Sequence, residues 1–186
     1  MKNNIYRQFR ILAFSVTVMS VCANSLCAQT SSTQSKTTKS TSDYVFLALP
    51  SGTIWKMSNE EGFYTYAEAQ TQFGAKLPTK KQWQELIDCC TWTWTGKGYK
   101  VTDKKGTGIY FPANGYKSSF GNLLGKDENA FYWASTPNDT TTSTYSSGLW
   151  IEHKKVVKDK VIVEYVNNIH LYDSKKDYHQ SVRLVK

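Results

Sequence analysis

Aromatic and amide side chains of the kind that recognise ligands are concentrated in the last third of the chain. Tyr and Asn make adaptable binding surfaces at a small cost in side-chain entropy, and the face of a Trp ring can stack on a sugar ring. The residues are Asn138, Asp139, Tyr145, Trp150, Asn167, Asn168, Tyr172 and Tyr178. They predict a binding surface, although the sequence leaves open whether Trp150 points to the core or to solvent.

Residue types that carry out catalysis do not form a recognisable arrangement. The imidazoles are His153, His170 and His179. No two of them stand at a metal-ligand spacing in one element, and no Gly-x-Ser-x-Gly or His-Glu-x-x-His motif surrounds them. Asp127 and Glu128 form an acid pair without a feature that would give the two carboxyls different roles. Because no nucleophile stands beside a base, we expect no enzyme activity and no cofactor.

The cysteines do not provide a disulfide framework. Cys22 and Cys27 fall in a segment that we expect to be removed, which leaves Cys89 and Cys90. Adjacent cysteines pair only through a strained ring and cannot link distant segments. We expect Cys90 to be buried and Cys89 to be nearby but free, since no Cys-x-x-Cys motif or basic neighbour supports a redox role.

Two amphipathic helices in the first half of the chain provide the scaffold. Thr79, followed three residues later by Gln82, predicts a capping box and a helix that begins at or just after Thr79. A shorter helix is predicted from about Thr65 to Phe73, ended by Gly74. The apolar stripe of the second helix comprises Trp83, Leu86, Ile87 and Cys90. We expect Trp83 to be buried in the core under both helices.

Short strands account for most of the rest. A hairpin of Tyr44 to Leu49 and Thr53 to Met57 is predicted first, and Thr91 to Thr95 extends from the second helix. The other predicted strands are Tyr99 to Thr102, Ile109 to Phe111, Phe131 to Ser135, Gly148 to His153, Val161 to Val166, His170 to Tyr172 and Ser181 to Val185. Two helices in the first half of the domain, followed by many strands in the second half, predict an α+β fold.

The N-terminus has the pattern of a secretory signal peptide, residues 1–28. Lys2, Arg7 and Arg10 precede the apolar run Ile11 to Ala23, as in signal peptides. We therefore expect an exported protein that is periplasmic, on the cell surface or extracellular. The apolar run is shorter than the roughly 20 residues that a membrane-spanning helix needs, so we expect no transmembrane segment.

A tether and a single domain are predicted after the signal. Residues 29–42 are almost all Ser, Thr, Gln and Lys, which cannot bury a core and indicate a flexible tether. Residues 43–186 have the length of one domain. A lipid anchor on Cys22 or Cys27 is an alternative, although Val21 and Leu26 stand where a lipoprotein signal normally has a small residue.

The formal net charge of +8 overstates how basic the domain is. Five of the positive charges precede residue 43, which leaves +3 for residues 43–186. The remaining basic residues are interleaved with acids, as in Lys154 to Lys160 around Asp159. We therefore expect no nucleic-acid binding and a monomer whose partner is a glycan or a protein.

Eight segments of the chain, in order, resemble a bacterial family, the Fibrobacter succinogenes major paralogous domain. The segments are Leu49 to Gly52 with Trp55, Tyr64 to Ala69, Leu77 to Thr79 with Trp83, Cys90 to Trp94, Gly98 to Thr102, Ile109 to Tyr116, Tyr132 to Pro137 and Ser181 to Val185. The resemblance implies a C-type-lectin-like fold, with two helices packed on a twisted, mostly antiparallel sheet with long loops.

This fold implies where a ligand would bind. Its first and last strands pair, and here Val45 to Leu49 and Val182 to Val185 suit that pairing. The loop Thr136 to Ser147 would then lie at the opposite, free end, where loops on a rigid scaffold often carry recognition residues. The predicted ligand-binding residues are Trp133, Asn138, Asp139, Tyr145, Trp150 and Tyr172.

Two chemistries known on related folds are not supported by the residues. Calcium takes about six to eight oxygen ligands, and only Thr136 to Asp139 resembles a calcium loop, while Trp150 is followed by Ile151 instead of the Asn-Asp of C-type lectins. Formylglycine-generating enzymes use cysteines near the end of the fold, and Gln180 to Lys186 has none. We expect a binding module without a metal; a divergent enzyme and a structural envelope protein are the alternatives.

Overall fold

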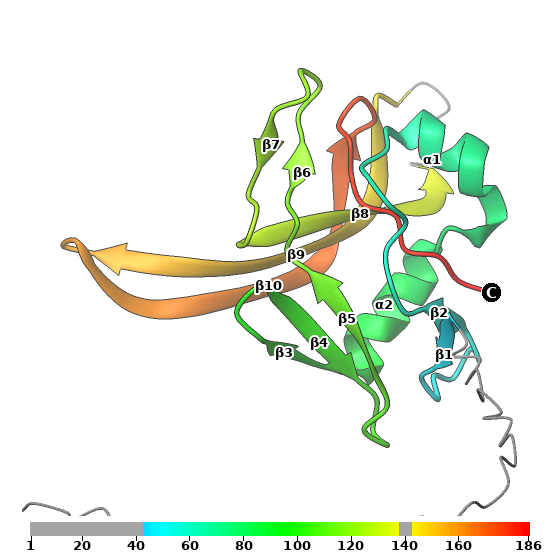
Figure 1. The fold of residues 1–186 in the computed structure, drawn as a ribbon, viewed down its shortest axis with the longest axis horizontal. Coiled ribbons are helices and arrows are strands. Elements are labelled where there is room, and N and C mark those ends of the chain that lie inside the picture. The colour runs from blue at the N-terminus through cyan, green and yellow to red at the C-terminus, as the bar shows by residue number, and fades with distance from the viewer. Residues whose placement is uncertain (1–42, 138–142) are drawn as a thin grey trace, which may run out of the picture. The chain divides into compact units, whose positions relative to one another are not determined.

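The computed structural model describes residues 43–137 and 143–186, which form an α+β fold with antiparallel sheets (Figure 1). The helices are α1 (Tyr66–Phe73), a short turn of 3-10 helix η1 (Gly74–Lys76) and α2 (Lys80–Cys89). The strands are β1 (Tyr44–Phe46), β2 (Ile54–Lys56), β3 (Thr91–Trp94), β4 (Gly98–Thr102), β5 (Gly108–Pro112), β6 (Tyr116–Lys117), β7 (Leu123–Leu124), β8 (Asn129–Pro137), β9 (Tyr145–Lys158) and β10 (Val161–Lys175). In the part of the chain that the structure describes, no helix has the length and apolar character needed to cross a membrane.

Both helices begin where local side chains cap them. The Thr79 hydroxyl accepts from the Gln82 backbone N–H (3.2 Å), and the Gln82 side chain accepts from the Thr79 N–H (2.8 Å). This confirms the predicted capping box and the start of α2. Thr65 and Glu68 form a second capping box at α1. Each box satisfies backbone donors that the first helical turn leaves without partners.

The core is centred on Trp83, which has no exposed surface. Its ring centroid lies 4.8 Å from that of Trp55, 5.7 Å from that of Tyr132 and 5.9 Å from that of Phe111. Leu86, one turn further along α2, is equally buried. The predicted burial of Trp83 is therefore confirmed, and α2 is held against the strands mainly by apolar contact.

The largest sheet has the order β10-β9-β8. The sequence predicted Gly148 to His153, Val161 to Val166 and His170 to Tyr172 as separate short strands, whereas β9 and β10 are continuous and form one long hairpin. The break predicted at Asn167 and Asn168 is absent because both side chains have partners: Asn167 accepts from the Tyr99 hydroxyl (2.7 Å), and Asn168 donates to Glu152 (2.7 Å). Satisfied amide side chains are tolerated in a strand.

The C-terminal segment does not pair as predicted. Val45 and Phe46 belong to β1, which pairs with β2, and the C-terminal segment lies along β2 instead of β1. A bridge joins Trp55 and Val185, the backbones of Ile54 and Lys186 exchange two hydrogen bonds (3.0 Å each), and Lys56 N–H donates to Leu184 O (2.9 Å). The segment does not form a longer strand, because its other backbone hydrogen bonds go to different neighbours, such as Glu60 N–H to Val182 O (2.9 Å) and Val185 N–H to Lys76 O (2.9 Å). The C-terminus nevertheless lies beside β1 and β2 (Figure 1).

Candidate binding site

Three of the predicted ligand-binding residues lie near one another in the β8–β10 sheet. Tyr145 and Tyr172 line a hollow of about 280 Å³. Trp150 stands beside it, with its ring centroid 5.8 Å from that of Phe131 and 6.3 Å from that of Tyr172. The hollow, which we call the aromatic hollow, is lined by Tyr116, Phe131, Tyr145, Tyr172, Asp173, Ser174, Lys175 and Tyr178.

Strand alternation determines the orientation of Trp150. Ile151 and its neighbour Leu149 are buried in the main core, so Trp150 between them points to the opposite face of the sheet. There it is paired across the strands with Phe131 on one side and His170 on the other. Trp150 is half-buried by these rings rather than by the main core. Its indole nitrogen has no hydrogen-bond partner among the described residues.

Tyr116 and Tyr178 extend the aromatic hollow beyond the sheet. The Tyr116 ring lies 4.6 Å from the Phe131 ring, edge to face, and stacks on Tyr178 at 5.6 Å. Tyr178 belongs to the aromatic residues singled out in the sequence, whereas Tyr116 and Phe131 were not among the predicted site residues. A connected set of rings of this kind is rigid and presents apolar faces to a ligand.

The polar groups of the aromatic hollow lie around its rings. Gln180 donates from its side-chain nitrogen to the Tyr172 hydroxyl (2.6 Å), and burial raises the pKa of Tyr172 well above its usual value, so this phenol is neutral. Asp173 accepts from the Ser147 hydroxyl (2.7 Å), and Lys175 completes the lining. The site thus combines apolar ring faces with one negatively charged and one positively charged side chain, both able to form hydrogen bonds. This combination suits a polyhydroxylated ring better than a purely apolar ligand.

Trp133 does not belong to this surface, contrary to the sequence prediction. It is fully buried, its indole nitrogen donates to Tyr64 O (2.7 Å), and its ring packs against Tyr66 at 5.4 Å. The strand carrying Trp133 is irregular between Trp133 and Pro137, and Ser181 of the C-terminal segment accepts from the Trp133 backbone. A local sequence pattern does not show that a distant segment of the chain covers Trp133.

Other predicted features of the site region are placed differently. Asn138 and Asp139 lie outside the described residues. The predicted loop Thr136 to Ser147 is shorter, because β8 continues to Pro137 and β9 begins at Tyr145. Tyr145 is 43% exposed and is therefore the most accessible of the predicted rings.

The histidines contact aromatic rings or bond to a neighbouring backbone, and the cysteines are partly buried. His153 and His170 are strand residues that contact aromatic rings, and His179 exchanges backbone hydrogen bonds with Lys117. Within residues 43–137 and 143–186, no group of three His, Cys, Asp or Glu residues is placed to hold a metal ion. Cys89 and Cys90 are free and partly buried; desolvation raises the pKa of Cys90 to about 11, so its thiol is protonated at neutral pH.

No family model matches the chain, and no curated protein or solved structure matches it either.

Proposed function

We propose that this protein is an exported binding module that recognises a glycan at the aromatic hollow and carries out no catalysis. The observation that carries the proposal is the set of contacting rings of Tyr116, Phe131, Trp150, Tyr172 and Tyr178 around an open hollow with a carboxylate and a lysine. Aromatic faces take the C–H face of a sugar ring, and the polar groups select among its hydroxyls.

We further propose that the domain is a divergent member of the Fibrobacter succinogenes major paralogous domain family with a C-type-lectin-like fold. Support comes from the eight segments that resemble the family, from two helices followed by many strands, and from the closeness of the chain end to β2. The signal-peptide pattern of residues 1–28 supports export. Fold alone does not define a ligand, so the glycan assignment depends on the aromatic hollow.

We predict that replacing Tyr145 and Tyr178 together with Ala weakens glycan binding about fivefold or more, because each ring contact contributes about 0.5–1.5 kcal/mol. The glycan would first be found by screening residues 43–186 on a glycan array, and its affinity would then be measured by titration calorimetry. Tyr145 is exposed and Tyr178 is partly exposed, so the melting temperature should change little.

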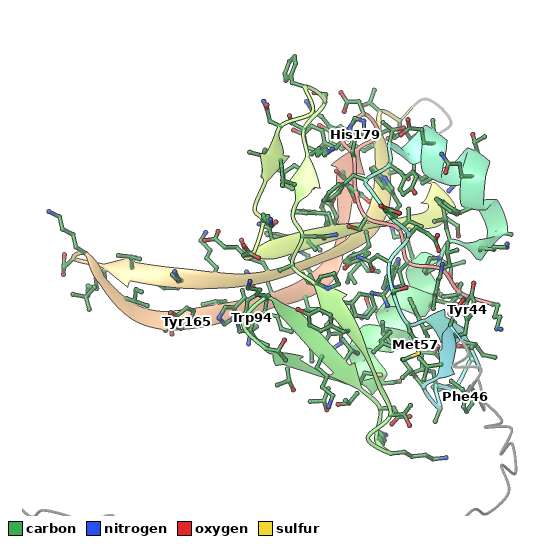
Figure 2. All side chains as sticks on the ribbon, viewed as in Figure 1. Tyr44, Phe46, Met57, Trp94, Tyr165 and His179 are labelled. Carbon is green, nitrogen blue, oxygen red and sulfur yellow. The ribbon has the colours of Figure 1, made fainter. Side chains whose placement is uncertain are left out.

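The matched control for this experiment is Phe46→Ala. Phe46 is also an exposed aromatic residue, and it lies at the opposite end of the domain from His179, the chain neighbour of Tyr178 (Figure 2). Phe46→Ala should leave glycan binding unchanged. Equal affinity of wild type and the Tyr145/Tyr178 variant would show that the ligand binds elsewhere, and turnover of the glycan during the titration would favour the divergent-enzyme alternative.

A further inference from the structure

The β9–β10 hairpin leaves a strand position unfilled in its sheet. The β8 strand pairs with β9 only as far as Asn129 and Glu152, whereas β9 continues to Lys158 and stays paired with β10 on its other side. Figure 1 shows the hairpin extending past the start of β8 and away from the other strands. The outer half of β9, residues 153–158, therefore has an open edge where β8 would continue if it were longer.

The open edge presents backbone hydrogen-bonding groups. The last bond on this side runs from His153 N–H to Glu128 O (2.8 Å). Because alternate residues of an antiparallel strand direct their N–H and C=O groups to the same side, Lys155 and Val157 direct theirs to the open edge as well. No described residue pairs with the backbone of either residue on that side. Such an edge is a template for one additional strand.

One face of the open edge adjoins a second hollow, of about 380 Å³, beneath the hairpin. Trp94, His153 and Tyr165 form a stack here, with ring centroids 4.3 Å and 4.9 Å apart. Figure 2 shows Trp94 and Tyr165 beside one another. The second hollow is lined by Trp94, Gly96, Lys126, Asp127, Glu128, His153, Lys155 and Tyr165. It offers aromatic surface to every second side chain of an added strand.

The other face of the open edge is basic. Lys154 and Lys158 alternate with Lys155 and therefore point away from the second hollow. Both are exposed, and neither forms an ion pair with any described residue. Lys126 and Lys155 lie on the hollow side, so four lysines surround the open edge. The carboxylates nearby are those of Asp127 and Glu128 on the hollow side and of Glu164, which pairs with Val156, on the other face. The lysines would repel the same edge of a second copy.

From these observations we propose that the open edge of β9 docks an extended segment of a partner protein in which acidic and apolar residues alternate. The segment adds as an antiparallel strand in line with β8. Its backbone bonds to Lys155 and Val157, its apolar side chains meet Trp94 and His153, and its acidic side chains face Lys154 and Lys158. The second hollow lies on the opposite face of the sheet from Trp150, and the proposal does not depend on glycan binding.

The test uses two fluorescein-labelled peptides, Ser-Glu-Val-Glu-Phe-Asp-Val-Ser and its counterpart with Lys at each acidic position. Fluorescence anisotropy with residues 43–186 should show saturable binding of the acidic peptide and binding of the Lys peptide at least about tenfold weaker. The variant Lys154→Glu with Lys158→Glu should weaken binding of the acidic peptide about fivefold or more. The control Lys104→Glu with Lys105→Glu, in the turn between β4 and β5, should not change it.

A second variant separates strand addition from simple charge attraction. Val157→Pro removes an N–H at the open edge without removing a bond of the β9–β10 ladder, so it should reduce binding about tenfold while the lysines stay in place. Equal binding of both peptides, or unchanged binding by Val157→Pro, overturns the proposal. So does a dimer in sedimentation velocity that Val157→Pro dissociates, which would assign the edge to a second copy, or binding to phosphatidylserine vesicles in place of peptide.

Discussion

Replacing Arg183 with Met is expected to lower the free energy of unfolding by about 3–5 kcal/mol, because it leaves several buried oxygen acceptors without donors, at about 1–3 kcal/mol each. Arg183 has no exposed surface. Its guanidinium donates to Asn59 Oδ1 (2.9 Å) and to backbone oxygens of Lys56 (2.8 Å), Met57 (2.7 Å) and Tyr110 (2.6 Å). Met would leave these acceptors buried without donors. Urea unfolding followed by circular dichroism would measure the loss.

The burial of Arg183 also determines how its contribution to stability depends on pH. Desolvation lowers the pKa of Arg183 from its usual value to about 10, so the folded protein binds fewer protons than the unfolded chain only above about that pH. This pKa stays well above neutral pH, so stability from this group should stay constant across the neutral range.

Arg183→Lys is the matched control, because it keeps the charge and loses the planar set of donors. We expect an intermediate loss of stability. The Arg183 guanidinium carbon also lies 4.4 Å from the Phe111 ring centroid, a contact that Lys would not reproduce as a flat stack. If the Met variant unfolds at the same urea concentration as wild type, the guanidinium does not organise the C-terminal segment.

Replacing Trp83 with Ala is expected to destabilise the domain by about 3–5 kcal/mol, as for other large-to-small aromatic substitutions in cores. The indole fills the space between α2 and the strands and contacts the rings of Trp55, Phe111 and Tyr132. Its nitrogen also donates to Trp133 O (3.4 Å). Thermal or urea unfolding would show the loss as a shift of the midpoint.

Two variants set the scale for this measurement. Trp83→Phe keeps part of the ring volume and should cost less than Trp83→Ala. Phe120→Ala removes a side chain that is 90% exposed and should change stability by no more than about 0.5 kcal/mol. A shift for Trp83→Ala as small as that for Phe120→Ala would contradict the placement of Trp83 at the centre of the core.

The helices could be predicted from the sequence because their signals are local. Thr79 and Gln82 lie within one turn, and Trp83 and Leu86 follow at helical spacing, so the start and the buried face of α2 depend on neighbours only. Strand pairing depends on residues far apart in the chain. The sequence of the C-terminal segment predicted an ordinary strand. In the structure, however, the Arg183 side chain points inward and donates to the backbone oxygens of Lys56 and Met57, more than a hundred residues earlier in the chain. No local sequence pattern indicates this contact.

The candidate site was predictable only as a set of residue types. Tyr145, Trp150 and Tyr172 were singled out because aromatic residues gather near the end of the chain. Trp150 and Tyr172 share one face, and Tyr145 lines the aromatic hollow at the start of β9. Phe131 joins them because β8 pairs with β9 in a register that sets it opposite Trp150, and that register cannot be read from either strand alone. Trp133, two residues further, is covered by the C-terminal segment.

The most direct test of glycan binding at the aromatic hollow is the ¹H–¹⁵N spectrum of the six tryptophan indoles during titration with a glycan identified on the array. Trp150→Phe would assign the Trp150 signal. We predict that this signal moves progressively with glycan concentration, because the Trp150 ring borders the aromatic hollow, while the signals of buried Trp83 and Trp55 stay in place. If the Trp150 signal stays fixed while that of Trp94 moves, the glycan binds beneath the hairpin and the assignment to the aromatic hollow is wrong.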